Sequence, residues 1–244
     1  MRTYDEMISG LKDLKSQGFV KTHRSGDTGI GKTLEDLLEI EENNIQGPDG
    51  EDTELKAARK NSNSMLTLFT KSPLPRGINS QLRAEYGYPD DNHPDKQVIR
   101  TTIDATRFTI IEKSPEKIGF MIVNKGNRIE ILPSRPPKKN SEMPNPYWNK
   151  EDFENSIKKK YKKSLLYVKA DTKGKDSDER FHFNEAYLLE GFDFTKFAKN
   201  LKDGILKVDI RLGLYPDGRF HDHGTGVRIR PALLDECFSG KKVL

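Results

Sequence analysis

The apolar residues of this chain come in short runs, and this limits most strongly what it can fold into. The longest runs, such as residues 118–123, have the length of a β-strand and fall far short of the ~18 residues of a membrane-spanning helix. Elsewhere apolar residues recur every three or four positions, as in Met7, Leu11 and Leu14, which is the period of a helix packed on a core. The pattern therefore predicts a mixed α/β protein without a membrane segment.

Charge and cysteine content exclude further classes. Hydrophobic and charged residues each make up 33% of the 244 residues, and the net charge is +4, which permits a nucleic-acid partner without requiring one. Cys237 is the single cysteine, so an intramolecular disulfide and a cysteine-based zinc site are excluded. The first ten residues, MRTYDEMISG, lack the apolar stretch of a signal peptide, and we expect a cytoplasmic protein.

Periodicity and turn residues predict where the elements lie. We expect helices near residues 7–14, 30–41, 78–86, 153–161 and 194–201. We expect strands near residues 53–57, 65–69, 108–111, 118–123, 128–132, 165–170 and 205–212. The polar residues between the first two strands suit a hairpin connection. Five prolines in residues 133–146 indicate an exposed linker.

A glycine-rich segment at residues 26–33, GDTGIGKT, matches the P-loop spacing G-x-x-x-x-G-K-[ST]. A P-loop needs a buried hydrophobic strand that delivers its glycines to a helix N-terminus, where backbone N–H groups bind phosphate. The residues before it, VKTHRS, are too polar for a buried central strand. A nucleotide hydrolase using Lys32 and Thr33 is therefore only a remote alternative.

Acidic residues dominate the next stretch, with nine carboxylates and neither Lys nor Arg from Glu35 to Glu54. Like charges at this density repel one another. They fit either a solvated surface or a group of side chains that converge on a divalent cation.

Within this stretch, Pro48-Asp49 followed by Glu54-Leu55-Lys56 fits the PD-(D/E)-x-K pattern of metal-dependent nucleases. On a strand, Glu54 and Lys56 share one face, so that Asp49 can meet Glu54 at one metal ion. The Leu55 carbonyl is a natural additional ligand. Acid-x-Lys triplets also occur at 13–15 and 171–173, so the pattern alone leaves the nuclease site and the solvated surface equally open.

Residues 207–230 combine arginines with carboxylates and aromatic side chains. On a twisted hairpin, arginines can donate bidentately to guanine, and carboxylates can accept from cytosine amino groups. His221-Asp222-His223 also fits a metal clip, but metal sites usually need a third protein ligand, so we favour a base-reading face over a clip or a solvated hairpin. A separate basic tract, 158–163, fits either a solubilising helix face or phosphate contacts.

Several segments, in this order, resemble the MvaI/BcnI family of type II restriction endonucleases, relatives of the MutH mismatch-repair nickase in the PD-(D/E)xK superfamily. They are TGIGKTLEDLLE (28–39), PDGEDTELK (48–56), LTLFTKSP (66–73), PRG (75–77), FHFNEAYLL (181–189), KVDIRLGLY (207–215) and HDHGTGVRI (221–229). The resemblance is greatest to the MvaI branch and small in residues 90–164. It implies a restriction-endonuclease-like mixed α+β core, in which a central mixed sheet is flanked by helices, and two lobes that form a cleft for DNA.

The resemblance also implies a catalytic set of Glu35, Asp49, Glu54 and Lys56. Asp49, Glu54 and the Leu55 carbonyl would bind Mg²⁺, with Mn²⁺ expected to substitute and Ca²⁺ expected to support binding without cleavage. Lys56 would orient or activate the attacking water and stabilise the charge of the phosphorane. Glu35 would act as a further acidic group.

For DNA recognition, the resemblance implies that the C-terminal hairpin enters the major groove. The residues that would contact bases are Asp209, Arg211, Tyr215, His221, Asp222, His223 and Arg228. Thr70 and Lys71, on a strand expected to pair with the catalytic one, would line the active site.

The resemblance finally implies a division of the chain and an activity. Residues 1–95 would form the catalytic lobe, 96–150 a variable strand meander with the Pro-rich linker, and 151–244 the DNA-recognition lobe with the hairpin and a return to the core. The expected enzyme is a monomer that cleaves double-stranded DNA at CC-N-GG sites with a central A·T pair, by Mg²⁺-dependent hydrolysis and sequential nicking. A cognate DNA methyltransferase is the expected functional partner. The alternatives are a MutH-like nickase, a P-loop nucleotide hydrolase and a catalytically silent DNA-binding protein.

Overall fold

The computed structural model describes residues 1–41, 47–139 and 142–244, and these form two compact units. Unit 1 comprises residues 1–66, 156–196 and 230–244, and unit 2 comprises residues 67–155 and 197–229. The chain passes from one unit to the other several times, within α4 and α5 among other places. The units therefore do not coincide with the consecutive segments 1–95, 96–150 and 151–244 that the sequence suggested.

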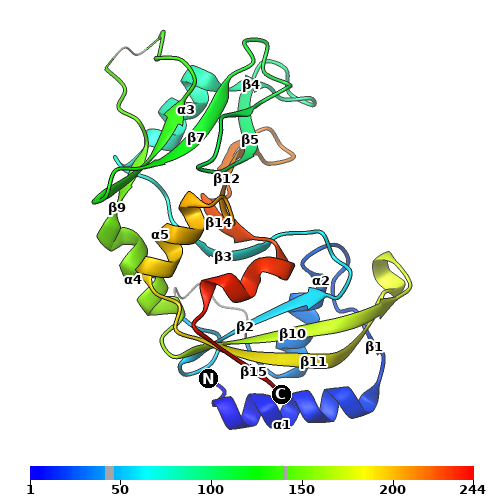
Figure 1. The fold of residues 1–244 in the computed structure, drawn as a ribbon. Helices are drawn as coiled ribbons and strands as arrows, with labels where there is room; N and C mark the ends of the chain where they lie inside the picture. Colours follow the sequence, from blue (N-terminus) through cyan, green and yellow to red (C-terminus); the bar gives the residue numbers. More distant parts are fainter. Residues whose placement is uncertain (42–46, 140–141) are drawn as a thin grey trace. The chain divides into compact units, whose positions relative to one another are not determined.

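Unit 1 is built on a mixed sheet with the strand order β1-β11-β10-β2 (Figure 1). Its strands are β1 (Val20–Lys21), β2 (Thr53–Arg59), β10 (Ser164–Lys173), β11 (Arg180–Glu190) and β15 (Gly240–Val243), the last of which pairs with β11. β10 runs antiparallel to β11 and parallel to β2, with Ser164 beside Thr53 and Ala170 beside Arg59. β2 therefore receives its only strand neighbour in the described sheet from a segment 111 positions further along the chain.

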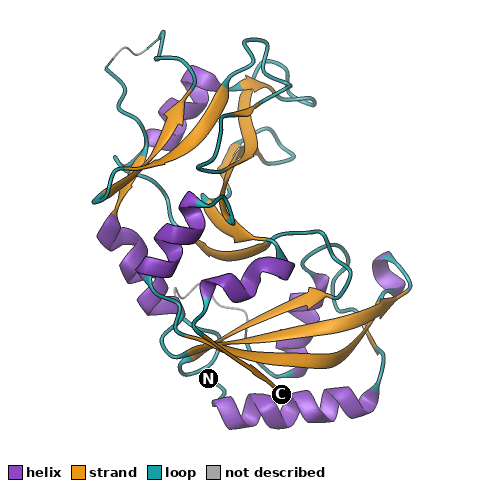
Figure 2. Cartoon of the chain, viewed as in Figure 1, coloured by secondary structure: helices purple, strands orange, loops and turns teal. Residues whose placement is uncertain are grey.

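Two helices cover one face of this sheet, α1 (Tyr4–Gln17) and α2 (Gly29–Leu37) (Figure 2). Thr3 and Glu6 form a capping box that begins α1, and the predicted apolar stripe of α1 is buried. The helices pack on Leu55 and Ala57 of β2 and on apolar residues of β10 and β11. Because side chains alternate across a strand, Glu54 and Lys56 lie on the opposite face of the sheet. Two short 3₁₀ helices complete the unit, η1 (Asp176–Asp178) and η2 (Pro231–Cys237).

Unit 2 contains two sheets. The first has the order β3-β14-β12-β5-β4, with β13 paired to β12, and the second has the order β6-β7-β8-β9. The strands are β3 (Leu66–Thr70), β4 (Tyr88–Pro89), β5 (Gln97–Ile103), β6 (Thr109–Ile110), β7 (Gly119–Asn124), β8 (Arg128–Pro133), β9 (Tyr147–Asn149), β12 (Leu206–Leu214), β13 (Phe220–Asp222) and β14 (Gly226–Ile229). The remaining helices are α3 (Ile78–Tyr86), α4 (Lys150–Lys160) and α5 (Phe194–Lys202).

The meander predicted for residues 108–132 is confirmed by the antiparallel pairing of β6, β7 and β8. Gly126 provides the left-handed backbone of the β7–β8 turn at φ +86°, a conformation that glycine adopts without steric cost. Its N–H donates to the side chain of Asn124.

The predicted hairpin between β2 and β3 is wrong, since β3 lies in the first sheet of unit 2 beside β14. After β2 the chain still follows β10, where the N–H of Lys60 donates to the carbonyl of Ala170 at 3.0 Å. The polar residues after β2 mark the end of a strand, but they carry no information on which sheet the next strand joins.

The predicted exposed linker at 133–146 is only partly correct for its described residues, 133–139 and 142–146, because about half of them are exposed but the segment is attached to α3. Glu85 of α3, which is 5% exposed, accepts from Arg135 at 2.9 Å and from the backbone N–H groups of Lys138 and Lys139 at 2.6 and 2.8 Å. Met143 is buried as well. A buried carboxylate thus fastens this proline-rich segment to α3.

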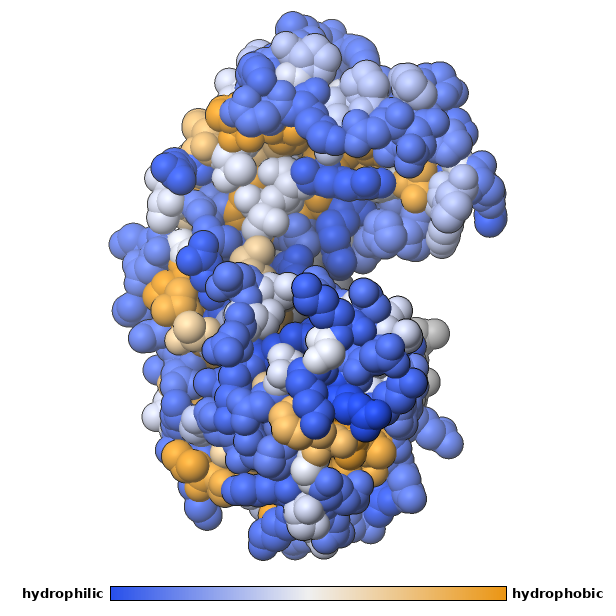
Figure 3. Space-filling model, turned by 90° about the vertical axis from the view of Figure 1, so that its right-hand side faces the viewer, coloured by the Kyte–Doolittle hydropathy of each residue, from blue (hydrophilic) through white to orange (hydrophobic). Residues whose placement is uncertain are grey.

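Hydrophilic side chains cover most of the face seen in Figure 3, with apolar patches between them. In the described part of the chain, no helix is both long and apolar enough to cross a membrane.

Candidate active site and nucleic-acid interface

β2 carries a buried acid–lysine pair on the face of the sheet away from α1 and α2. The Lys56 Nζ donates to the Glu54 Oε1 at 2.9 Å, and the side chains are 15% and 1% exposed. The Glu54 Oε2 is also buried, and it has no hydrogen-bond partner among the described residues. Leaving a buried carboxylate oxygen unpaired costs free energy, so this atom is a candidate ligand.

Asp49 is held beside this pair by the backbone of β2. Its Oδ2 accepts from the N–H of Leu55 at 2.9 Å, so this N–H points away from β10 and towards the free edge of the sheet. On a strand, the carbonyl of a residue points to the same side as its N–H. The predicted ligands Asp49, Glu54 and the Leu55 carbonyl therefore lie together at the start of β2.

The electrostatics of the pair follow from its burial. Burial raises the pKa of the Glu54 carboxyl, and the charge of Asp49 adds to this rise, while the two neighbouring ammonium groups of Lys56 and Lys160 offset part of it. Burial alone would lower the pKa of Lys56. The charge and hydrogen bond of Glu54, with contributions from Asp49 and Glu35, outweigh burial and leave this pKa raised. Lys56 is therefore an ammonium group at neutral pH.

These residues fit a divalent cation such as Mg²⁺. The unpartnered Oε2, the Asp49 carboxylate and a backbone carbonyl are oxygen ligands of the kind that Mg²⁺ takes in proteins, usually with several waters retained. Within residues 1–41, 47–139 and 142–244, no group of three His, Cys, Asp or Glu side chains is placed to hold a metal. An ion here would depend on the two carboxylates, the carbonyl and water.

Glu35, the fourth predicted catalytic residue, lies on α2 in the same unit, and its charge makes a small contribution to the raised pKa of Lys56. The P-loop match, residues 26–33, runs into the start of the same helix, and its geometry is not that of a phosphate loop. Lys32 pairs with Asp36 at 2.8 Å, and the Thr33 hydroxyl accepts from the N–H of His23 at 2.9 Å. The strand before the P-loop match, β1, has only two residues and lies at the sheet edge.

Residue Glu42 of the acidic stretch lies outside the described residues.

Lys160 lies at this candidate site, although sequence reasoning did not single it out. It is the last residue of α4, and its Nζ lies 2.9 Å from the Glu54 Oε1. The sequence signal was the position of the basic tract directly before the strand that pairs with β2. That signal becomes informative only once the parallel pairing of β10 and β2 is known.

Thr70 and Lys71 occupy unit 2, at the end of β3, so their predicted place on a strand paired with β2 is wrong. The Lys71 N–H donates to the Thr225 carbonyl at 2.9 Å, and its Nζ pairs with Asp152 at 3.2 Å. Both residues are therefore tied to the sheet that contains β12 and β14.

β12 lies between β14 and β5 and carries a row of polar side chains on one face. Arg211 is the direct cross-strand partner of Arg100, and Asp209 is the partner of Thr102. Asp209 is buried, and it accepts from the Thr102 hydroxyl at 2.8 Å and from the Arg228 Nη1 at 2.9 Å. Its Oδ2 also lies 3.4 Å from the Arg211 Nε. Asp209 thus hydrogen-bonds to Arg228 and forms an ion pair with Arg211.

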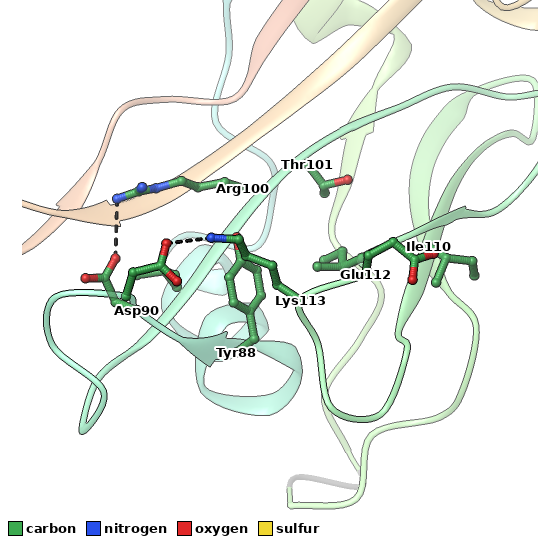
Figure 4. Close-up of a pocket in the computed structure, with 10 residues that line it drawn as sticks. Tyr88, Asp90, Arg100, Thr101, Ile110, Glu112 and Lys113 are labelled. Atoms are coloured by element: carbon green, nitrogen blue, oxygen red, sulfur yellow. Dashed lines mark hydrogen bonds and ion pairs between the residues drawn. The ribbon is translucent and has the colours of Figure 1, made fainter.

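Arg100 was not predicted, and it is half-exposed beside these arginines. A cavity of about 530 Å³ is lined by Arg100, Thr101, Thr102, Asp209, Arg211 and His223. A second cavity, of about 390 Å³, includes the ion pairs of Arg100 with Asp90 and of Lys113 with Asp91 (Figure 4).

The hairpin of β12 and β13 carries the remaining predicted DNA contacts. The Asp222 Oδ2 accepts from the Asn79 side chain of α3 at 2.8 Å, and its Oδ1 accepts from the Gly224 N–H at 2.8 Å.

The aromatic rings of the hairpin lie in a row. Ring centroids are 4.1 Å apart for Tyr215 and His221 and 3.8 Å apart for His221 and His223. Burial, with the neighbouring His221, lowers the pKa of His223, so this ring is neutral at pH 7.

Comparison with known proteins identifies the family to which this chain belongs. A model of the MvaI/BcnI restriction endonuclease family matches residues 8–238. The chain belongs to the MvaI/BcnI restriction endonuclease family.

Solved structures of restriction endonuclease MvaI resemble this MvaI/BcnI chain over its whole length. With MvaI in complex with its cognate DNA substrate, the TM-score is 0.85 at 32% sequence identity, covering 100% of this chain and 99% of that chain. With MvaI in the absence of DNA, the TM-score is 0.60 at 32% identity, covering 100% and 98%. A comparison with curated proteins gives no match.

Family membership makes this MvaI/BcnI chain a type II site-specific deoxyribonuclease that acts on double-stranded DNA. Restriction endonucleases of this family use divalent metal ions. The predicted family and the mixed α+β restriction-endonuclease fold are confirmed.

Proposed function

We propose that this endonuclease cleaves double-stranded DNA at CC-N-GG sites by Mg²⁺-dependent hydrolysis, with Asp49, Glu54 and the Leu55 carbonyl as the metal ligands. The observation that carries the proposal is the buried, unpartnered Glu54 Oε2 beside a second carboxylate that the strand backbone holds in place. We expect Mn²⁺ to substitute for Mg²⁺, and Ca²⁺ to support binding without cleavage.

The protein residues around this site have separate tasks. When bound, Mg²⁺ supplies Lewis-acid polarisation of the scissile phosphate and a lowered pKa for the attacking water. Lys56 contributes an ammonium group in a water-poor setting, where it stabilises the charge that develops on the phosphorane and orients the water. Glu35 of α2 acts as a further acidic group, as a ligand or through a water molecule.

We assign recognition of the DNA sequence to the polar face of β12 and to the hairpin of β12 and β13, both in unit 2. Arg211 and Arg228 are the guanine-reading residues of the proposal, since both lie beside Asp209, which hydrogen-bonds to Arg228 and pairs with Arg211. Arg100 joins them because it is the cross-strand partner of Arg211.

The hairpin residues Tyr215, His221, Asp222 and His223 are assigned to the major groove. Because Asn79 and the Gly224 N–H occupy both carboxylate oxygens of Asp222, this residue sets the hairpin position as well.

The proposed recognition site has a central A·T pair, and the enzyme acts as a monomer. One chain contains one Asp49–Glu54–Lys56 set, so a monomer must nick one strand and then rebind to nick the other. A cognate DNA methyltransferase would protect the same sites in the host DNA.

The test is digestion of a sequenced plasmid with Mg²⁺, with the ends mapped by sequencing, for the wild type and two variants. Glu54→Ala should abolish cleavage, whereas Glu51→Ala, an exposed acid from the same loop, should leave it unchanged. Cuts confined to CC-N-GG sites support the proposal. Single-strand nicks at another sequence, or cleavage that survives in Glu54→Ala, would overturn it in favour of a repair nickase or a different catalytic site.

A further inference from the structure

Two ammonium groups contact the same oxygen of Glu54. The Nζ atoms of Lys56 and Lys160 each lie 2.9 Å from Oε1, while Oε2 has no hydrogen-bond partner among the described residues. Only Lys56 is part of the acid-x-lysine pattern that identified the site. The second ammonium group is therefore an addition that the pattern does not account for.

The fold brings Lys160 to this position through the parallel pairing of β10 with β2. Four residues after Lys160, Ser164 begins β10, and its hydroxyl lies 3.0 Å from that of Thr53. The N–H of Lys163 donates to the carbonyl of Asp52 at 3.1 Å. These contacts fix the end of α4 against the start of β2.

The neighbouring lysines of the same tract are placed differently. Lys158 and Lys159 are exposed, whereas the Lys160 side chain is only 25% exposed. The part of the tract that lies on α4 thus contains two solvated lysines and one that is directed into the site, which gives matched controls of the same residue type on the same helix.

We propose that Lys160 is a positioning residue for Glu54: together with Lys56 it occupies Oε1, so that Oε2 is the oxygen presented to the divalent ion. The terminal torsion of a glutamate is broad, and a carboxylate with one partner can exchange its two oxygens by rotation. A second cation on the same oxygen disfavours that exchange and also compensates a buried charge. The inference rests on the proposed function, in which Glu54 is a metal ligand.

The expected loss of metal affinity on removing Lys160 can be estimated from comparable variants at other metal sites. Removing a side chain that orients a metal ligand typically costs about 10–100-fold in metal affinity or activity. Simple charge repulsion predicts the opposite sign, because removing an ammonium group near a metal site should tighten binding of the cation. The direction of the change therefore separates positioning from repulsion.

The experiment measures binding of Mn²⁺ to the full-length protein without DNA, with free Mn²⁺ followed by EPR at one pH and ionic strength. Lys160→Ala should weaken Mn²⁺ binding about 10–100-fold, and Lys160→Arg should recover part of the loss. Lys158→Ala and Lys159→Ala, which remove the same charge, should stay within about twofold of the wild type, as expected for exposed charges screened by salt. Mn²⁺ binding by Lys160→Ala that is unchanged or tighter would overturn the proposal.

Glu54→Ala separates this proposal from the proposed function. If Glu54→Ala binds Mn²⁺ as well as the wild type does, the metal site itself is wrong. If Glu54→Ala loses Mn²⁺ binding and Lys160→Ala behaves like Lys158→Ala, the metal site stands and only the positioning role of Lys160 is overturned.

A second measurement distinguishes positioning from direct contact with DNA. If Lys160→Ala weakens binding to a CC-N-GG duplex equally with and without Ca²⁺, while its Mn²⁺ curve stays unchanged, Lys160 is a phosphate contact and the positioning role is rejected. Thermal unfolding of each variant confirms that the proteins compared are folded.

Discussion

The N–H of Leu55 donates to the Oδ2 of Asp49 at 2.9 Å, so the strand that carries Glu54 also holds the other carboxylate of the site. This hydrogen bond lies at the free edge of β2, where no further strand of the described residues pairs with it. An edge that would otherwise leave backbone groups unpaired thus becomes the support of a candidate metal site.

Asp49→Asn keeps an acceptor for the Leu55 N–H and removes the charge, whereas Asp49→Ala removes both. We expect both variants to lose at least about 100-fold in cleavage rate, because the charge is needed at the metal. Specific binding in Ca²⁺ should remain close to wild type in Asp49→Asn. Cleavage by Asp49→Asn near the wild-type rate would show that Asp49 is structural.

Arg211→Ala and Arg100→Ala test whether the polar face formed by β12 and β5 recognises the DNA sequence. If each side chain makes a bidentate contact with a guanine, each variant should lose about 1–3 kcal/mol of discrimination between cognate and altered duplexes. Arg107→Ala, an exposed arginine of the same unit, is the control and should keep the discrimination. Equal weakening on all duplexes would instead identify a phosphate contact.

Asn79→Ala removes the donor that holds Asp222 at 2.8 Å. Asn79 is buried on α3, so we expect an indirect effect, a loss of about 1 kcal/mol in specific DNA binding as the hairpin loses its anchor. Ser80→Ala, at the exposed neighbouring position, should bind like the wild type. Identical affinities for Asn79→Ala and Ser80→Ala would contradict a positioning role for this bond.

Glu85→Ala tests whether residues 135–139 are fastened to α3. It leaves the half-buried Arg135 without its buried partner, and we expect the free energy of unfolding to fall by about 3–5 kcal/mol. Glu116→Ala removes a more exposed carboxylate that also contacts Arg135, and its effect should be about 1 kcal/mol or less. Urea unfolding measures both, and effects of equal size would argue against a structural role for Glu85.

Asp104 gives a pH dependence of stability. Burial would raise its pKa, but hydrogen bonds from Lys207 and Thr106 outweigh it and lower the pKa from 3.8 to about 2. A depressed pKa contributes stability that is present above pH 4 and is lost as the pH falls through about 2. Asp104→Asn should therefore lower the free energy of unfolding by about 1–2 kcal/mol at pH 7, with the difference from wild type shrinking below pH 4. A constant difference between pH 7 and pH 3 in urea unfolding would rule out this linkage.

Residues that share one strand were predictable from the sequence, and residues that meet through strand pairing were not. Glu54 and Lys56 follow from the two-residue period of a strand. Lys160 and Arg100 reach their positions only through the pairings of β10 with β2 and of β5 with β12, which periodicity does not encode.

The errors in the predicted β2–β3 hairpin and in the predicted linker at 133–146 have the same origin. The polar residues after β2 indicate that a strand ends, but the partner of β3 depends on contacts made much later in the chain. The prolines at 133–146 indicate an irregular backbone, whereas its attachment depends on Glu85, about fifty positions earlier.

The parallel pairing of β2 with β10 has a consequence for the order of events during synthesis. Asp49, Glu54 and Lys56 leave the ribosome early, yet the strand beside them and the lysine at their shared oxygen come more than a hundred residues later. Long-range pairing of this kind forms late because the intervening chain must first be closed into a loop. A nascent or truncated chain that ends before β10 thus contains the whole acid-x-lysine motif and still has no sheet on which to assemble it. The proposed catalytic set can therefore form only when most of the chain has been made.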